Sequence, residues 1–227
     1  MFSRMTIKKQ SAPSGDLGGL IVGLGNPGLK YERTRHNLGF MAVCALLVDL
    51  SVRGVIVEEL HSGSKFQCRL WRCALPGCSV HWLAAMPLTF MNLSGESVQP
   101  LLNWYKLAPH QLLIIHDELD LPLGNLKLKN GGGTAGHNGL KSISERLGTR
   151  DFYRLRMGVG RPPALADAIG WVLGSFAPDE QKIAETMLSK AVEGVLLFAE
   201  QGAAKAATII NAGPQKKREP KNINGES

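Results

Sequence analysis

The segment Leu112–Pro122, LLIIHDELDLP, decides how the rest of the chain is interpreted. Its first five residues, Leu112 to His116, are apolar or nearly so, which is typical of a central strand buried on both faces. The acidic residues Asp117, Glu118 and Asp120 follow at once. Ligands of open α/β sheets bind beyond the carboxyl ends of the strands, so we expect Asp117 to face a charged crevice.

Apolar runs on both sides of this segment alternate between strand-like and helix-like spacing. Strands are expected at residues 19–24, at three places within 55–86 and at 152–160. Helices are expected from Leu38, from about residue 94 to Tyr105, from about Leu140, and from Pro178 to about Glu200. This alternation favours an α/β fold built in layers, and 227 residues are enough for one domain with its own core.

The two ends of the chain are polar. Residues 1–18 have basic and hydroxyl side chains but no long apolar core, which argues against a secretory signal. We expect a disordered extension there, with an organellar transit peptide as the alternative. Residues 213–227 form a basic, polar tail that is also expected to be disordered. The folded domain is therefore expected at residues 19–212.

Charge and hydropathy restrict the classes of partner. The net charge of +7 favours a polyanion such as nucleic acid. The chain contains no run of roughly 18 to 20 uninterrupted apolar residues, so we expect a soluble protein that makes no contact with membranes.

The four cysteines do not form a metal-binding pattern. None belongs to a C-x-x-C motif, and Cys68 and Cys73 lie five residues apart in a predicted strand. That spacing places their side chains on opposite faces of the sheet, where they cannot bind one ion. We interpret the cysteines as reduced thiols of a cytosolic protein and expect no metal site.

Two glycine-rich segments resemble nucleotide-binding motifs without satisfying them. Residues 23–28, GLGNPG, fit the spacing G-x-G-x-x-G, but the apolar helical pattern begins only near Leu38, whereas a dinucleotide fold needs its helix to begin at the glycines. Residues 127–139, KLKNGGGTAGHNG, do not form the G-x-x-x-x-G-K-[ST] motif of a phosphate-binding loop, because Leu140 precedes Lys141 and Ser142. A dinucleotide-dependent enzyme therefore stays only a weak alternative.

His36 is the histidine best placed to act with Asp117. It follows the loop at the carboxyl end of the first predicted strand, so a doubly wound sheet brings it to the same rim as Asp117. His116 should point away from Asp117, because neighbouring residues of a strand alternate between faces. The other histidines considered have no cluster of polar residues around them and are interpreted as structural or solvated: His61, His81 and His110.

Three asparagines are expected at the same rim. Asn26 follows the first strand, Asn92 follows the strand that ends at Met86, and Asn138 ends the glycine-rich segment. With His36 and Asp117, they suggest a site that binds a carbonyl group through hydrogen bonds while a base activates water. The chain has no G-x-S-x-G motif, which argues against a covalent serine mechanism.

Basic residues are concentrated in the thirty positions that follow. Together with the glycine-rich segment and the net positive charge, they suggest a track for a phosphodiester backbone beside the crevice. They are Lys127, Lys129, Lys141, Arg146, Arg150, Arg154 and Arg156.

Four motifs, in this order, closely resemble the bacterial-type peptidyl-tRNA hydrolase family, over about residues 19 to 200. The motifs are GLGNPG with YERTRHNLG (23–39), PLTFMNLSG (87–95), HDELDLP (116–122) and KLKNGGGTAGHNGLKSI (127–143). The resemblance implies an enzyme that hydrolyses the ester between a peptide and the 3′ ribose of tRNA. It also implies a monomeric, cytoplasmic, single-domain three-layer α/β/α protein with a mixed, twisted sheet and no required cofactor or metal.

The resemblance also assigns roles to individual residues. It makes His36 the general base, Asp117 the residue that supports it, and Asn26 the group that engages the peptide and separates blocked from unblocked aminoacyl-tRNA. The remaining assignments are substrate-site residues Tyr31, Phe90, Met91, Asn92 and Asn138, and tRNA phosphate contacts Lys127, Lys129 and Arg156.

Two regions depart from the family pattern: the extension before residue 19, which leaves localisation open, and the end of the chain, which resembles the family only loosely. An RNA-binding module without hydrolytic activity is the main alternative. The intact His36, Asp117, Asn26 and Asn92 argue against it.

Overall fold

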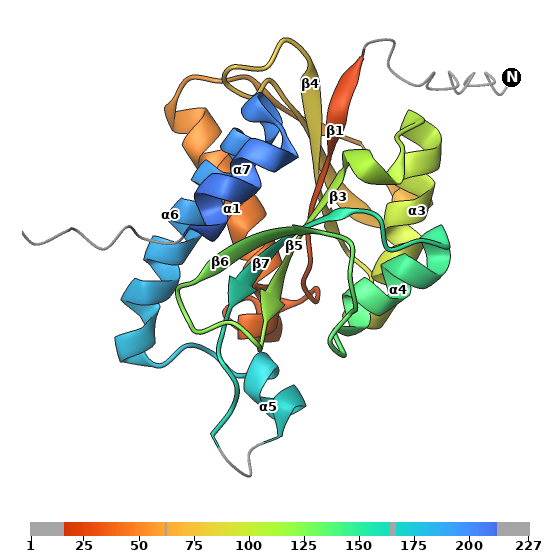
Figure 1. Ribbon diagram of the computed structural model, residues 1–227. Coiled ribbons are helices and arrows are strands. Elements are labelled where there is room, and N and C mark those ends of the chain that lie inside the picture. Colours follow the sequence, from red (N-terminus) through yellow and green to blue (C-terminus); the bar gives the residue numbers. More distant parts are fainter. Residues whose placement is uncertain (1–15, 62, 164–166, 213–227) are drawn as a thin grey trace, which may run out of the picture.

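A seven-stranded, twisted sheet forms the centre of the protein, with helices on both faces (Figure 1). The computed structural model describes residues 16–61, 63–163 and 167–212. In sequence the strands are β1 (Leu17–Gly23), β2 (Val57–Leu60), β3 (Cys68–Cys73), β4 (His81–Pro87), β5 (Leu112–Glu118), β6 (Leu126–Asn130) and β7 (Tyr153–Gly158). Their order across the sheet is β2-β3-β4-β1-β5-β7-β6.

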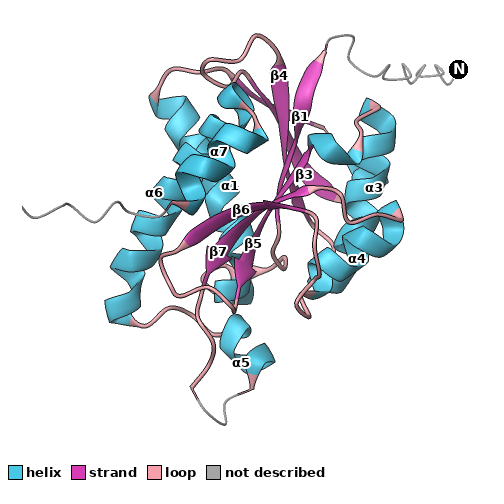
Figure 2. Cartoon of the chain, viewed as in Figure 1, coloured by secondary structure: helices cyan, strands magenta, loops and turns pink. Residues whose placement is uncertain are grey.

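The helices form the two outer layers. One face is covered by α1 (Leu38–Val52), α6 (Pro178–Gln201) and α7 (Ala203–Asn211), and the other by α3 (Ser94–Tyr105) and α4 (Asn138–Leu147) (Figure 2). Short helices α2 (Gly63–Phe66) and α5 (Ala168–Leu173) lie in connections. Within the part of the chain that the structure describes, short 3₁₀ turns lie at η1 (Leu29–Tyr31), η2 (Arg35–Asn37), η3 (Met91–Leu93) and η4 (Pro109–Gln111). The predicted three-layer α/β/α fold with a mixed sheet is confirmed.

Strand β5 is central, as the sequence predicts. All seven of its residues are buried, and it pairs in parallel with β1 on one side and β7 on the other. Because β4 is also parallel to β1, four adjacent strands end at the same rim of the sheet. The outer strands β2, β3 and β6 pair antiparallel to their neighbours or to each other. The rim at the end of β5 therefore collects the loops that follow β1, β4 and β7.

Two glycines bring the chain after β1 close to this rim. A side chain on Gly39 would collide with the backbone of Leu24 and with the carbonyl of Ile115, in the middle of β5. A side chain on Gly23 would collide with the carbonyl of Gly39 itself. The start of α1 therefore lies directly on the end of β1 and on the middle of β5, which fixes the preceding turn η2 beside Asp117. As predicted, the helix begins at Leu38 and not at the GLGNPG motif.

Some details differ from the sequence-based expectations. Residues 17 and 18, expected within the disordered extension, belong to β1. Asp16, also expected within that extension, is exposed. Residues 1–15 of the extension and the predicted tail, residues 213–227, lie outside the described residues. Strand β6 and helix α5 are absent from the predicted elements, because β6 runs into the glycine-rich segment without a break and α5 spans only six residues.

One segment is apolar in its mean hydropathy, although its 18 residues are not an uninterrupted apolar run. Among the described residues, the segment Arg35–Val52 is long and apolar enough to cross a membrane by length and composition. In the fold it provides α1, whose Leu38, Leu46 and Leu50 are fully buried against the sheet. Its hydropathy is therefore explained by its place in the core.

The faces of β3 agree with the prediction for the cysteines. Cys68 packs in the core between the sheet and α3, whereas Cys73 packs in the core under α1 and α6. The two side chains lie on opposite sides of the sheet, as the five-residue spacing predicts.

Candidate active site

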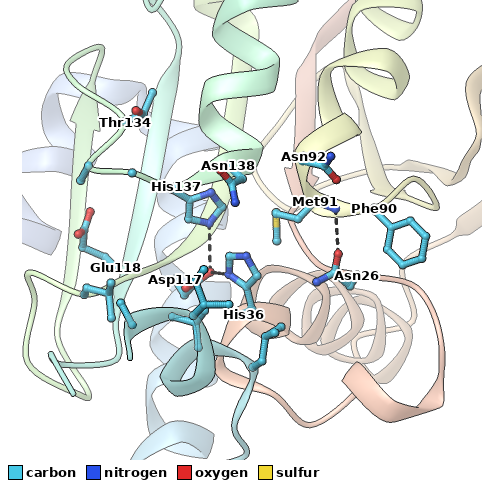
Figure 3. A pocket seen from close by; sticks show the side chains of 17 residues that line it. Asn26, His36, Phe90, Met91, Asn92, Asp117, Glu118, Thr134, His137 and Asn138 are labelled. Atoms are coloured by element: carbon cyan, nitrogen blue, oxygen red, sulfur yellow. Dashed lines mark hydrogen bonds and ion pairs between the residues drawn. The ribbon is translucent and has the colours of Figure 1, made fainter. Parts of the chain in front are cut away.

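A cavity of about 650 Å³ opens at the rim where β1, β4 and β5 end (Figure 3). Its walls come from the loops after these strands, from the beginning of α4 and from one side of α5. The lining residues are Asn26, His36, Phe90, Met91, Asn92, Asp117, Glu118, Leu119, Thr134, Ala135, Gly136, His137, Asn138, Ala168, Ile169, Val172 and Leu173.

His36 and Asp117 meet in this cavity, although 81 positions separate them in the sequence. Nδ1 of His36 lies 2.9 Å from Oδ1 of Asp117, whose side chain is only 3% exposed. Because the carboxylate accepts the Nδ1–H proton, the lone pair of the imidazole resides on Nε2, the nitrogen available to a substrate or water. An imidazole held in this tautomer by a buried carboxylate is suited to act as a general base.

A second histidine, His137, contacts the same carboxylate oxygen. Its Nε2 lies 3.1 Å from Oδ1 of Asp117 (Figure 3). Its Nδ1 accepts from the backbone N–H groups of Gly139 and Leu140, so His137 is the N-cap of α4. Since Nδ1 is an acceptor, Nε2 must be the donor. Both nitrogens of His137 are therefore engaged, which leaves His36 as the histidine with a free nitrogen in this cluster.

The two histidines hold Asp117 in its charged form. Burial alone would raise the pKa of the carboxyl group, but the charges and hydrogen bonds of His137 and His36 lower it further than burial raises it, and the resulting pKa lies well below the ordinary range. Asp117 can thus accept both hydrogen bonds throughout the neutral range.

His116 takes no part in this cluster of hydrogen bonds. Its Nδ1 lies 2.7 Å from the backbone carbonyl of Asp117, and its ring stacks edge-on against His137 at 4.9 Å between centroids. Burial, followed by the neighbouring His137, lowers the pKa of His116 to about 3. The residue is therefore neutral and structural.

The side chain of Asn26 is fixed by the next loop along the rim. Its Oδ1 accepts from the N–H of Met91 at 2.8 Å, and its backbone exchanges two hydrogen bonds with the side chain of Asn37. With its oxygen engaged, Asn26 presents its NH₂ group to the cavity (Figure 3). The arrangement provides a preorganised donor opposite His36, suited to a carbonyl oxygen.

The other predicted substrate-site residues fall into two groups. Phe90, Met91, Asn92 and Asn138 line the cavity, and Phe90 is 55% exposed. Tyr31 is not among the lining residues. It ends η1, where the ammonium of Lys30 lies 4.7 Å from its ring centroid.

The predicted phosphate contacts lie on β6 and β7, beside the main cavity. Lys127 is directly opposite Arg156 in the antiparallel pair, and Lys129 is opposite Arg154, so the four basic side chains share a face. Lys129, Arg154 and Arg156 line a second hollow of about 300 Å³. Arg156 also donates to the nearly buried Glu118 at 2.8 Å.

Arg154 has a structural role. It is buried, and its guanidinium donates to the carbonyls of Gly132 and Gly133 at 3.0 and 2.7 Å. These bonds hold the glycine-rich segment, which returns from the far end of β6 to the rim and carries His137 into the cavity.

The donor atoms of His36, Asp117 and His137 lie within 4.8 Å of one another, a spacing at which a metal ion could bind. The hydrogen bonds explain the cluster without one, because each histidine directs an N–H group at the carboxylate. Sequence reasoning overlooked His137. The signal was its position before Asn138 and Gly139, at the start of a predicted helix, where an N-cap acceptor is required.

Comparison with known proteins identifies the family of this chain. Residues 20–221 match the sequence model of the family described as peptidyl-tRNA hydrolase. The peptidyl-tRNA hydrolase of Nitratidesulfovibrio vulgaris strain Miyazaki F is 52% identical over 199 residues, which cover 87% of this chain and 98% of that protein. The one from Desulfovibrio desulfuricans is also 52% identical, over 86% of this chain and 84% of its own length.

Crystal structures extend the comparison to the fold. Peptidyl-tRNA hydrolase from Acinetobacter baumannii is 37% identical and superposes with a TM-score of 0.76, covering 88% of this chain and 98% of that one. A peptidyl-tRNA hydrolase in complex with N-propanol is 38% identical, with the same TM-score and the same shares covered. The chain therefore belongs to the peptidyl-tRNA hydrolase family.

Proposed function

We propose that this protein hydrolyses the ester bond between a peptide and the 3′ ribose of tRNA, with His36 as the general base. The observation that carries the proposal is the 2.9 Å contact between His36 Nδ1 and the buried carboxylate of Asp117, in the wall of the cavity of about 650 Å³. That contact orients the imidazole and stabilises the imidazolium formed when it takes a proton.

The reaction needs one activated water molecule. Nε2 of His36 accepts a proton from water as the water oxygen attacks the ester carbonyl carbon. The tetrahedral intermediate then expels the 3′ oxygen of the ribose, which takes the proton back from His36. The products are free tRNA and a peptide with a new carboxylate, and no covalent enzyme intermediate is required.

Asn26 is proposed to donate from its NH₂ group to a carbonyl of the peptide portion. Peptidyl-tRNA and N-blocked aminoacyl-tRNA have an amide carbonyl next to the ester, whereas unblocked aminoacyl-tRNA has a charged amine there. A fixed amide donor favours the carbonyl and offers no acceptor to the ammonium. Phe90, Met91, Asn92 and Asn138 are proposed to line the path of the substrate, with Tyr31 at its margin.

The tRNA phosphates are proposed to lie along Lys127, Lys129 and Arg156. Support comes from the shared face of these side chains and from the second hollow next to the main cavity. We also propose that the enzyme acts in the cytoplasm, where translation supplies its substrate. We also propose a monomer, which is what the resemblance to the family implies.

Incubation with N-acetyl-aminoacyl-tRNA and, separately, with its unblocked counterpart tests this function. We expect release of free tRNA from the blocked substrate and little from the unblocked one. Equal release from both would contradict the role of Asn26. Binding of tRNA without release from either would favour the RNA-binding alternative.

A further inference from the structure

We propose that Arg35 is a positioning residue that ties the catalytic turn η2 to helix α5, one wall of the cavity. The inference rests on the proposed role of His36, which follows Arg35 directly in η2. Consecutive residues of a 3₁₀ turn point in directions about a third of a turn apart. The side chain of His36 accordingly reaches Asp117, while that of Arg35 points in a different direction and reaches α5 and the start of α6.

The guanidinium of Arg35 contacts α5 and the residues that follow it. Nη1 donates to the carbonyl of Ser175 at 2.9 Å and lies 3.4 Å from that of Trp171. The guanidinium carbon stacks 3.9 Å from the ring centroid of Trp171, in a cation–π contact. A side chain on Gly174 would crowd Nη1, so the glycine at the end of α5 permits this approach.

The backbone supports the same junction. The N–H of Arg35 donates to the carbonyl of Gly174 at 3.0 Å, and Thr34 forms an isolated β-bridge with Ser175. The turn that carries His36 is thus attached to the end of α5 by main chain and side chain together.

An ion pair completes the junction. Nη2 of Arg35 lies 2.6 Å from Oε2 of Glu180, and the side chains of Arg35 and Glu180 are 6% and 21% exposed. The same carboxylate oxygen accepts from the N–H of Ala177 at the start of α6. Removing Arg35 alone would leave this carboxylate largely buried and unpaired, which destabilises a protein whatever the role of the arginine.

The consequence for the reaction is geometric. Helix α5 contributes Ile169, Val172 and Leu173 to the cavity, facing the His36 side. Arg35 therefore fixes the distance between the base and the wall against which a substrate must rest. A reacting group misplaced by about 1 Å can cost on the order of a hundredfold in rate.

The test compares Arg35→Met/Glu180→Gln with the matched surface pair Arg53→Met/Asp49→Asn. In the first variant no charge is left buried and unpaired, and the amide oxygen introduced by Glu180→Gln still accepts from the N–H of Ala177. Arg53 and Asp49 form an exposed ion pair within and just after α1, away from the cavity. kcat for N-acetyl-aminoacyl-tRNA is measured at a temperature where every variant is fully folded. Amide hydrogen exchange is followed in α5 and, as an internal reference, in α4.

We expect the Arg35 variant to lose about 10- to 100-fold in kcat, to exchange the amides of α5 at least about tenfold faster, and to bind free tRNA as the wild type does. The surface variant should match the wild type in all three. Wild-type kcat or unchanged exchange in α5 for the Arg35 variant would overturn the inference. His36→Ala is included in the same assay: if it is active, the proposed base is wrong, whereas an inactive His36→Ala beside a fully active Arg35 variant contradicts only the role of Arg35.

Discussion

Nε2 of His137 lies 3.1 Å from Oδ1 of Asp117, the oxygen that also accepts from His36. The backbone N–H groups of Gly139 and Leu140 occupy the other nitrogen of His137, so its tautomer is fixed. One carboxylate oxygen therefore orients two imidazoles. The imidazole of His137 connects the site to the start of α4, whereas that of His36 keeps its Nε2 available to a ligand in the cavity.

The two functions of His137 can be separated by two substitutions. His137→Asn keeps a good N-cap for α4 but removes the hydrogen bond to the buried Asp117, so kcat should fall about tenfold and the free energy of unfolding by about 1 to 3 kcal/mol. His137→Ala also removes the cap and should lose about 1 kcal/mol more in the free energy of unfolding. Steady-state kinetics and denaturant unfolding measure the two effects. Full activity of both variants would mean that His36 alone determines the state of Asp117.

Asn26→Asp tests the donor opposite His36. The new carboxylate is nearly isosteric and can still accept from the N–H of Met91, so the fold should be retained. It presents an oxygen where the substrate carbonyl needs an N–H, and kcat/KM for N-acetyl-aminoacyl-tRNA should fall by about 100-fold or more. Asn26→Ala is the control, because it removes the donor without introducing a charge. Its kcat/KM should fall less than that of Asn26→Asp. A wild-type kcat/KM for Asn26→Asp would exclude Asn26 from substrate binding.

Much of this site follows from one rule about parallel sheets. The apolar run before Asp117 identifies β5, and the position of His36 after β1 places it at the same rim, although 81 positions separate the two residues. Asn26 and Asn92 reach the cavity for the same reason, whereas Asn138 arrives there together with its neighbour His137.

The remaining parts depend on contacts that local patterns do not encode. His137 reaches Asp117 only because the glycine-rich segment turns back from the far end of β6, a path fixed by the buried Arg154 and its bonds to Gly132 and Gly133. Arg35 belongs to a motif that the sequence identifies, but its partners on α5 and α6 lie more than 130 positions away. Tertiary contacts of this kind have no periodicity to detect.

The buried, neutral His116 should make stability depend on pH. Burial lowers its pKa from 6.5 to about 3, so between these values the unfolded chain binds a proton that the folded chain does not. Above pH 6.5, His116 does not change the free energy of unfolding. Below that pH, the free energy of unfolding falls by about 1.4 kcal/mol per pH unit. Denaturant unfolding from pH 6.5 to 4.5 measures this slope. His116→Gln should flatten the slope by that amount and the exposed His81→Gln should not; equal slopes in both would refute the assignment.

The basic face of β6 and β7 should determine how tRNA binding responds to salt. If Lys129 contacts one phosphate, Lys129→Ala should raise KM and reduce the slope of log K against log salt concentration by about one. Lys127→Ala and Arg156→Ala should act in the same direction, with Arg156→Ala also leaving Glu118 unpaired. Arg53→Ala, remote at the end of α1, is the reference. An unchanged slope for Lys129→Ala would mean that the side chain is only solvated.

The central claim is that His36, oriented by Asp117, activates the water that cleaves the ester. The most direct measurement is single-turnover hydrolysis of N-acetyl-aminoacyl-tRNA by His36→Ala at saturating enzyme, together with the Kd for free tRNA. The account predicts a rate lower by about 10²- to 10⁴-fold at an unchanged Kd. A rate within about tenfold of the wild type would contradict it.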